Sequence, residues 1–136
     1  MMPQSTHADR CADRYVFVYG TLRAGGSNDI ARYRPLPQRV ADGAIAGTLY
    51  DLGAYPGAVL GGEGRIRGEV YRIGPAVEAE LDLLKGVMPD GSGEYLKREL
   101  EVVIGPRRLI CLVYEIHPRH IDGRSVIASG DWFARN

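Results

Sequence analysis

The chain has 136 residues, 45% of them hydrophobic and 25% charged, and its 17 basic side chains balance its 17 acidic ones. This length and apolar content predict one globular domain with one core, and they exclude a fully disordered chain. The balanced charge provides no net field that would attract nucleic acid or an anionic membrane, so neither is expected as a partner.

The first 14 residues are polar and charged, and they are interpreted as a flexible N-terminal tail before a single domain over residues 15–136. They lack the apolar segment of a signal peptide, and no other stretch approaches the ~20 apolar residues of a membrane helix. Cys11 and Cys111 are too few for a disulfide framework, and their spacing matches no metal or redox motif. These features favour a cytoplasmic protein.

The run Tyr15–Tyr19 is β-branched and aromatic throughout and ends at Gly20, which predicts a strand buried on both faces. Glycine, asparagine and proline then predict a loop over residues 20–37, with a short helix near 29–33. Further strands are expected over residues 39–52, 65–73, 95–104 and 109–116. Turns are expected at residues 55–57, 61–64 and 105–106, where glycine and proline gather.

One helix is expected between the third and fourth strands. It begins at Pro75, whose missing N–H is tolerated in the first turn, and it closes at Gly86. Its apolar stripe is formed by Val77, Leu81 and Leu84. Lys85 in the last turn suits the helix dipole, and Asp82 three residues earlier is expected to pair with it. Because strands dominate the rest, the fold class is α+β, a curled or closed mixed sheet with one or two packed helices.

The exit from the first strand is a candidate ligand site. A buried strand that stops at Gly20 and turns sharply leaves backbone N–H groups without strand partners. Such donors suit a carboxylate or an oxyanion, although an ordinary strand-to-loop exit has the same sequence. The segment after Gly20 has neither the Walker pattern nor a G-x-G-x-x-G fingerprint, so nucleotide binding is not expected.

Glu94 is the candidate proton carrier. It follows a glycine-rich loop and precedes Tyr95 at the start of a strand, where a carboxylate can be desolvated. The alternative is a solvated loop glutamate, the usual environment of this residue type. His117 and His120 are three residues apart and have no evident third partner, so no metal site is expected.

Several segments in a fixed order resemble the γ-glutamylcyclotransferase-like (AIG2-like) family, and most of all its bacterial YtfP-like branch. They are Val16–Arg23, Tyr55–Ala58, Gly68–Tyr71, Glu80–Asp82, Gly93–Tyr95 and Ser129–Trp132, and together they span residues 15–134. The resemblance implies a small mixed β-barrel with flanking helices. It also implies that the partner is a small γ-glutamyl compound, cleaved to 5-oxoproline and a free amine by its own amine, with no metal or cofactor.

The resemblance also implies the residues of the site. The loop that holds the γ-glutamyl group through backbone amides, and two aromatic positions, correspond to Tyr19, Gly20, Thr21, Leu22, Tyr95 and Tyr114. Active members carry a glutamate just before the glycine that closes the helix, and that position is Lys85 here. The YtfP-like branch has its glutamate at the position of Glu94, which is the expected catalytic residue. Two functions stay open: a cyclotransferase, or a catalytically degenerate protein of the same fold that binds a small carboxylate.

Overall fold

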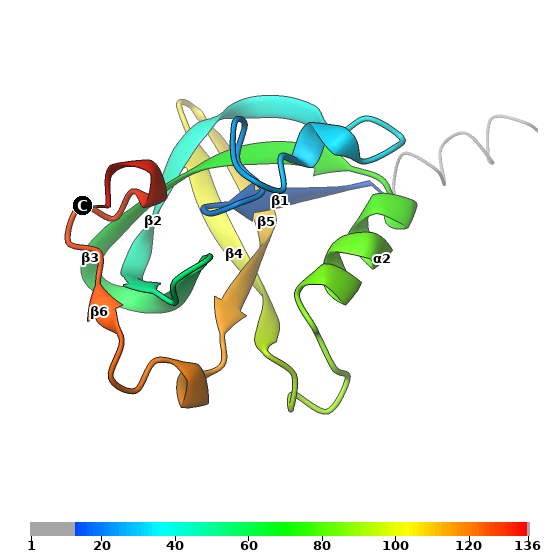
Figure 1. The fold of residues 1–136 in the computed structure, drawn as a ribbon. Coiled ribbons are helices and arrows are strands. Elements are labelled where there is room, and N and C mark those ends of the chain that lie inside the picture. Colours follow the sequence, from blue (N-terminus) through cyan, green and yellow to red (C-terminus); the bar gives the residue numbers. More distant parts are fainter. Residues whose placement is uncertain (1–12, 136) are drawn as a thin grey trace, which may run out of the picture.

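The computed structural model describes residues 13–135, so most of the expected N-terminal tail lies outside the described part of the chain. The strands form one mixed sheet in the order β4-β5-β1-β3-β2-β6, which curls into a half-barrel (Figure 1). They are β1 (Arg14–Val18), β2 (Gln38–Asp51), β3 (Pro56–Ile73), β4 (Tyr95–Ile104), β5 (Arg107–Ile116) and β6 (Ser125–Val126). β1 pairs antiparallel with β3 and parallel with β5, which makes the sheet mixed. The expected α+β fold is confirmed.

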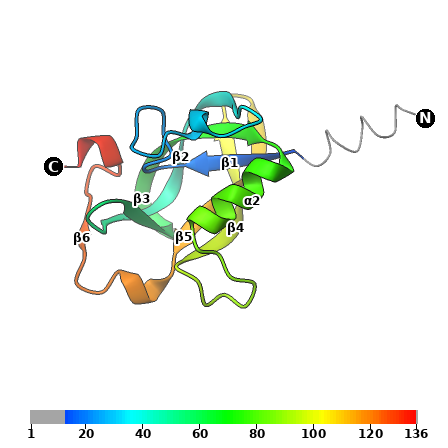
Figure 2. The same ribbon diagram turned by 45° about the vertical axis from the view of Figure 1, so that its right-hand side comes forward.

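One α-helix, α2 (Pro75–Leu84), lies against the sheet, as the turned view in Figure 2 shows. It closes at Gly86, whose φ of 61° is the left-handed conformation that favours glycine. Val77 and Leu81 are buried, but Leu84 is 43% exposed, so the buried stripe is shorter than expected. The other helices within residues 13–135 are single 3-10 turns at Ile30–Arg32, Pro118–His120 and Trp132–Ala134.

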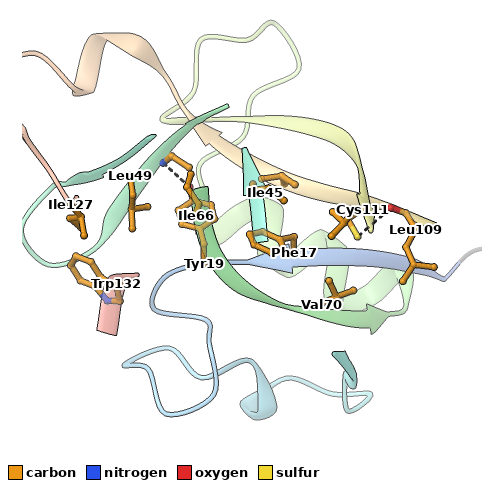
Figure 3. Close-up of a cluster of buried hydrophobic side chains, with 13 residues drawn as sticks. Phe17, Tyr19, Ile45, Leu49, Ile66, Val70, Leu109, Cys111, Ile127 and Trp132 are labelled. Carbon is orange, nitrogen blue, oxygen red and sulfur yellow. Dashed lines mark hydrogen bonds between the residues drawn. The ribbon is translucent and has the colours of Figure 1, made fainter. Parts of the chain in front are cut away.

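The first strand and the residue after it are buried on both faces, as the sequence predicts. Phe17 and Tyr19 belong to one core cluster, whereas Val16 and Val18 belong to another. The first cluster gathers side chains from most strands of the sheet and includes Trp132 near the C-terminal end (Figure 3). The second includes the two buried side chains of α2. Removal of apolar surface from water on both faces therefore fixes β1 in the middle of the sheet.

β1 is shorter than its neighbours, and this positions the loop that follows it. Beyond Val18, β3 and β5 pair directly with each other at Ala58 and Glu115. The chain therefore leaves the sheet at Gly20. A Cβ at this residue would lie 2.6 Å from the Cγ of Pro56, so only glycine fits the exit without displacing the proline ring.

Two expected turns differ from the structure. The reversal before β3 lies at residues 52–55, where the Leu52 N–H donates to the Tyr55 carbonyl, and the strand begins directly afterwards. Residues 61–64 do not separate two strands but form a bulge inside β3, since the register with β2 skips them. Glycines at 61 and 62, with φ of 96° and 82°, let the strand bulge without ending. The hairpin of β4 and β5 is confirmed.

Candidate active site

A pocket of about 280 Å³ lies between the loop after β1, the β2–β3 turn and the segment that joins α2 to β4. Thr21, Tyr55, Lys85, Glu94 and Tyr95 are among the residues that line it. Three of these, Thr21, Glu94 and Tyr95, are site residues expected from the sequence. The acidic side chain and the loop after the first strand therefore meet at one hollow.

The remaining expected residues line a second, much smaller hollow. They are Tyr19, Gly20, Leu22 and Tyr114. Lys85 borders both spaces, so the two hollows are neighbours. The residues carried over from the family resemblance thus surround one lysine that the resemblance did not place among them.

The loop Tyr19–Leu22 presents backbone donors. Within residues 13–135, no hydrogen-bond acceptor is found for the amide N–H groups of Gly20, Thr21 and Leu22. The loop itself is closed, because the Thr21 carbonyl accepts from the Asn28 N–H at 2.9 Å and its hydroxyl accepts from the Asn28 side-chain amide at 3.1 Å. Backbone donors held in place in this way suit a carboxylate ligand.

A buried ion-pair network fixes this loop from behind. The Arg23 guanidinium donates to Glu69 at 3.1 Å and to Asp131 at 2.8 Å. Glu69 is only 3% exposed, and it also accepts from the Ala24 N–H and the Tyr71 hydroxyl. Burial, together with the bond to Glu69, raises the pKa of Tyr71 to about 12, so this hydroxyl remains a donor. Sequence reasoning missed the network, although Glu69 and Asp131 lie in two of the segments that resemble the family.

Glu94 is held at the pocket by its backbone. Its N–H donates to the Gly86 carbonyl at 3.1 Å, and its carbonyl accepts from the His117 N–H at 2.9 Å. Its carboxylate accepts a hydrogen bond from the Tyr55 hydroxyl, and this bond raises the pKa of Tyr55. Tyr55 lies in one of the segments that resemble the family, but sequence reasoning gave it no role in the site. Glu94 is half-buried and shares the pocket with Thr21.

Lys85 is half-buried in the pocket wall, one residue before Gly86. Its Nζ lies 4.7 Å from the centroid of the Tyr95 ring, in a cation–π contact. Burial lowers its pKa from 10.5 to about 8, against the opposing influence of the Glu94 charge. At neutral pH the side chain is therefore still mainly an ammonium, in surroundings that disfavour the charged form.

The expected pairing of Asp82 with Lys85 is wrong. Asp82 accepts from the Lys97 ammonium at 2.9 Å and from the Tyr114 hydroxyl at 2.7 Å. Lys97 comes from β4, and its ammonium also contacts Glu78, one turn earlier on α2. A contact between strand and helix thus replaces the local one. Within the described residues, the Lys85 ammonium has no carboxylate in ion-pair contact.

The three expected tyrosines all make structural hydrogen bonds. The Tyr19 hydroxyl donates to the Tyr114 carbonyl at 2.6 Å and accepts from the Ala58 N–H at 3.1 Å, which joins β5 to β3. The Tyr95 hydroxyl donates to the Pro56 carbonyl at 2.7 Å. Burial raises the pKa of Tyr19, Tyr95 and Tyr114 far above the usual value, so all three keep their protons. Of the three, Tyr95 lines the larger pocket.

Other chemistries find little support in the described part of the chain. Residues 13–135 contain no group of three or more His, Cys, Asp and Glu side chains arranged to hold a metal ion. No helix over the same residues combines the length and the apolar character needed to cross a bilayer. Cys111 is buried, and burial raises the pKa of its thiol to about 11, which makes it a core residue rather than a nucleophile. Cys11 lies outside the described residues.

Comparison with known proteins adds to this geometry. The family model "Gamma-glutamyl cyclotransferase, AIG2-like" matches residues 16–134. The chain is 38% identical over 122 residues to the gamma-glutamylcyclotransferase family protein YtfP of Escherichia coli K12, and the match covers 89% of this chain and 97% of that protein. The solution NMR structure of ytfP from Escherichia coli is similar with a TM-score of 0.61 at 36% identity, over 89% of this chain and 97% of that one. The crystal structure of YkqA from Bacillus subtilis is similar with a TM-score of 0.68 at 27% identity, over 88% of this chain but 39% of that longer one.

Proposed function

Since the chain belongs to the gamma-glutamyl cyclotransferase, AIG2-like, family, we propose that it is a γ-glutamylcyclotransferase that acts on a small γ-glutamyl amide. In the proposed reaction, the α-amine of the substrate attacks its own γ-carbonyl carbon. A new C–N bond closes the five-membered ring of 5-oxoproline, and the amide C–N bond breaks to release a free amine. The observation that carries the proposal is that Glu94 and Thr21 of the donor loop line one pocket.

The described residues have the groups that this reaction requires. Because the attack is intramolecular, holding the substrate in a folded conformation supplies much of the rate enhancement. The unbonded amides of the Tyr19–Leu22 loop hold the α-carboxylate of the substrate. Glu94 accepts a proton from the attacking amine and returns one to the leaving nitrogen, so it ends the cycle unchanged. The Tyr55 hydroxyl, which is hydrogen-bonded to Glu94, keeps this carboxylate in one orientation.

The test is the release of 5-oxoproline from a panel of γ-glutamyl amides by wild type and by Glu94→Gln. The substitution removes the proton carrier and keeps the size of the side chain, so we expect kcat to fall ~10²–10⁴-fold. Glu80→Gln is the matched control, because Glu80 is exposed on α2 and is not among the pocket residues. It should retain full activity. Unchanged activity in Glu94→Gln would remove Glu94 from its proposed role.

A second function is favoured by one observation. Lys85 stands where the family resemblance implies a glutamate, and its ammonium has no ion-pair partner within residues 13–135. A pocket with such a cation can hold a small carboxylate without converting it. Thermal stabilisation of the protein by L-glutamine, with no 5-oxoproline released from any γ-glutamyl amide, would favour this binding function over the enzyme.

A further inference from the structure

Lys85 is a charged group of the pocket to which the proposed reaction gives no role. Charges that proteins remove from water are normally paired, because desolvation of an unpaired charge is unfavourable. The acidic neighbour of Lys85 on the helix, Asp82, bonds to Lys97 and Tyr114 instead. Glu94 is close enough to influence the charge of Lys85 but does not contact it as an ion pair. The ammonium is therefore available to a ligand.

The position of Lys85 relative to the backbone donors indicates which ligand group it would meet. It borders the small hollow together with Gly20 and Leu22, and the larger pocket together with Thr21 and Glu94. The site thus combines an ammonium and unbonded amide N–H groups with a nearby carboxylate. An amino acid head group, with a free α-carboxylate and an α-amino group, has the complementary charges.

We propose that Lys85 is a specificity residue whose ammonium binds the free α-carboxylate of the ligand, beside the amides of the Tyr19–Leu22 loop. The pocket thereby selects γ-glutamyl compounds with an ionised α-carboxylate and rejects those in which this group is an amide or an ester. Peptides that begin with glutamine belong to the rejected class, because their α-carboxyl group forms a peptide bond. The inference rests on the proposed function for the choice of a γ-glutamyl ligand, but the binding itself requires no turnover.

The same arrangement makes binding dependent on pH. In the free protein the pKa of Lys85 is about 8, and an anionic ligand raises it. The other titratable residues that line the two hollows with Lys85 are Glu94, Tyr19, Tyr55, Tyr95 and Tyr114. The hydrogen bond to Glu94 raises the pKa of Tyr55 and burial raises the pKa of the other three tyrosines, so their hydroxyls stay neutral as the ammonium titrates. Affinity for a carboxylate should therefore fall as the pH rises above about 8.

The experiment is a calorimetric titration of the full-length protein with L-glutamine and with L-glutaminamide, two γ-amides that differ only at the α-carboxyl group. At pH 7 we expect wild type to bind L-glutamine at least about tenfold more tightly, as a hydrogen bond between charged groups provides. In Lys85→Met, the ratio of the two affinities should fall about tenfold. Lys85→Arg keeps the positive charge, so it should retain most of the preference and lose the decline above pH 8.

Equal binding of the two ligands by wild type, no binding of either, or an unaltered preference in Lys85→Met would each overturn the inference. If Lys85→Met does not fold, the pH profile of Lys85→Arg decides, and a decline identical to that of wild type would count against Lys85. The 5-oxoproline assay separates the two proposals. Selective binding that depends on Lys85, without turnover, supports this inference and contradicts the cyclotransferase. Turnover with a KM that Lys85→Met does not change supports the cyclotransferase and contradicts this inference.

Discussion

The two sides of the pocket are built in opposite ways. On one side, the loop Tyr19–Leu22 offers backbone amides, and the buried network around Arg23 fixes it from behind. On the other side, residues 85–94 offer charged side chains, and hydrogen bonds to their backbone, such as that from the Glu94 N–H to the Gly86 carbonyl, hold the segment in place. The first side depends on packing and on buried charge. The second depends on which side chains occupy positions 85 and 94, which lie close together in space.

This contrast explains how the acidic group can come from residue 94. The hydrogen bond between Glu94 and Gly86 brings residue 85 close to residue 94, although the two are nine positions apart in sequence. Both side chains line the same pocket, so a carboxylate at either position could serve it. The family resemblance implies a glutamate at 85, whereas this chain combines Lys85 with Glu94. The exchange leaves the donor loop unchanged and adds a positive charge to the pocket.

Arg23→Met should break the first side and have the largest effect. It leaves the buried Glu69 carboxylate with only the exposed Arg39 guanidinium, 3.9 Å away, as a cation, and removal of one member of a buried ion pair costs about 3–5 kcal/mol. We expect urea denaturation to show a loss of about 3 kcal/mol in the free energy of unfolding. Arg65→Met is the control at an exposed arginine without an ion pair in the described chain, and it should change the value by less than about 0.5 kcal/mol. Similar losses in both variants would show that the network does not support the loop.

Gly93→Ala should break the second side, with more effect on activity than on stability. A Cβ at residue 93 would lie 1.9 Å from the Gly86 carbonyl oxygen, so the segment has to move and Glu94 moves with it. A displacement of about 1 Å can lower a catalytic rate ~100-fold, and we expect that loss in 5-oxoproline release. Gly91→Ala is the control, because its φ of 80° also strains an alanine while the nearest atom lies 4.0 Å away. An equal loss of activity in the control would contradict the importance of the contact with Gly86.

Local sequence signals were sufficient for the elements on which the pocket is mounted. The apolar run of β1, the proline and glycine at the ends of α2, and the turn of the β4–β5 hairpin each predict their element directly. The bulge at residues 61–64 could not be distinguished from a turn, since both use glycines with positive φ. Pairing with β2, which is distant in sequence, makes these residues a bulge, because β2 continues to pair with β3 on both sides of them.

For the candidate site, the sequence pointed to segments that meet at the pocket but not to the contacts between them. Tyr19 is expected to bind substrate, and its hydroxyl is engaged in a bridge between β3 and β5. The bond between Tyr55 and Glu94 joins residues 39 positions apart, and no local pattern reveals such a contact. Helical spacing favoured a pair between Asp82 and Lys85, but a lysine from β4 takes the carboxylate. These missed features of the site all depend on contacts between elements that are distant in sequence.

Lys85→Met should have the smallest effect, on stability, with a size that depends on pH. The pKa of Lys85 in the folded protein, about 8, lies below its ordinary value of 10.5. Between these values the unfolded chain binds more protons than the folded one, so the stability of wild type rises with pH across this window. At pH 7 wild type bears the full cost of the desolvated ammonium, and Lys85→Met should be more stable by on the order of 1 kcal/mol. Urea denaturation at pH 7 and pH 10 should show this advantage shrinking at the higher pH. If the stability advantage of Lys85→Met instead grew with pH, the pocket would stabilise the ammonium. Both sides of the pocket would then contain a charge that stabilises the fold.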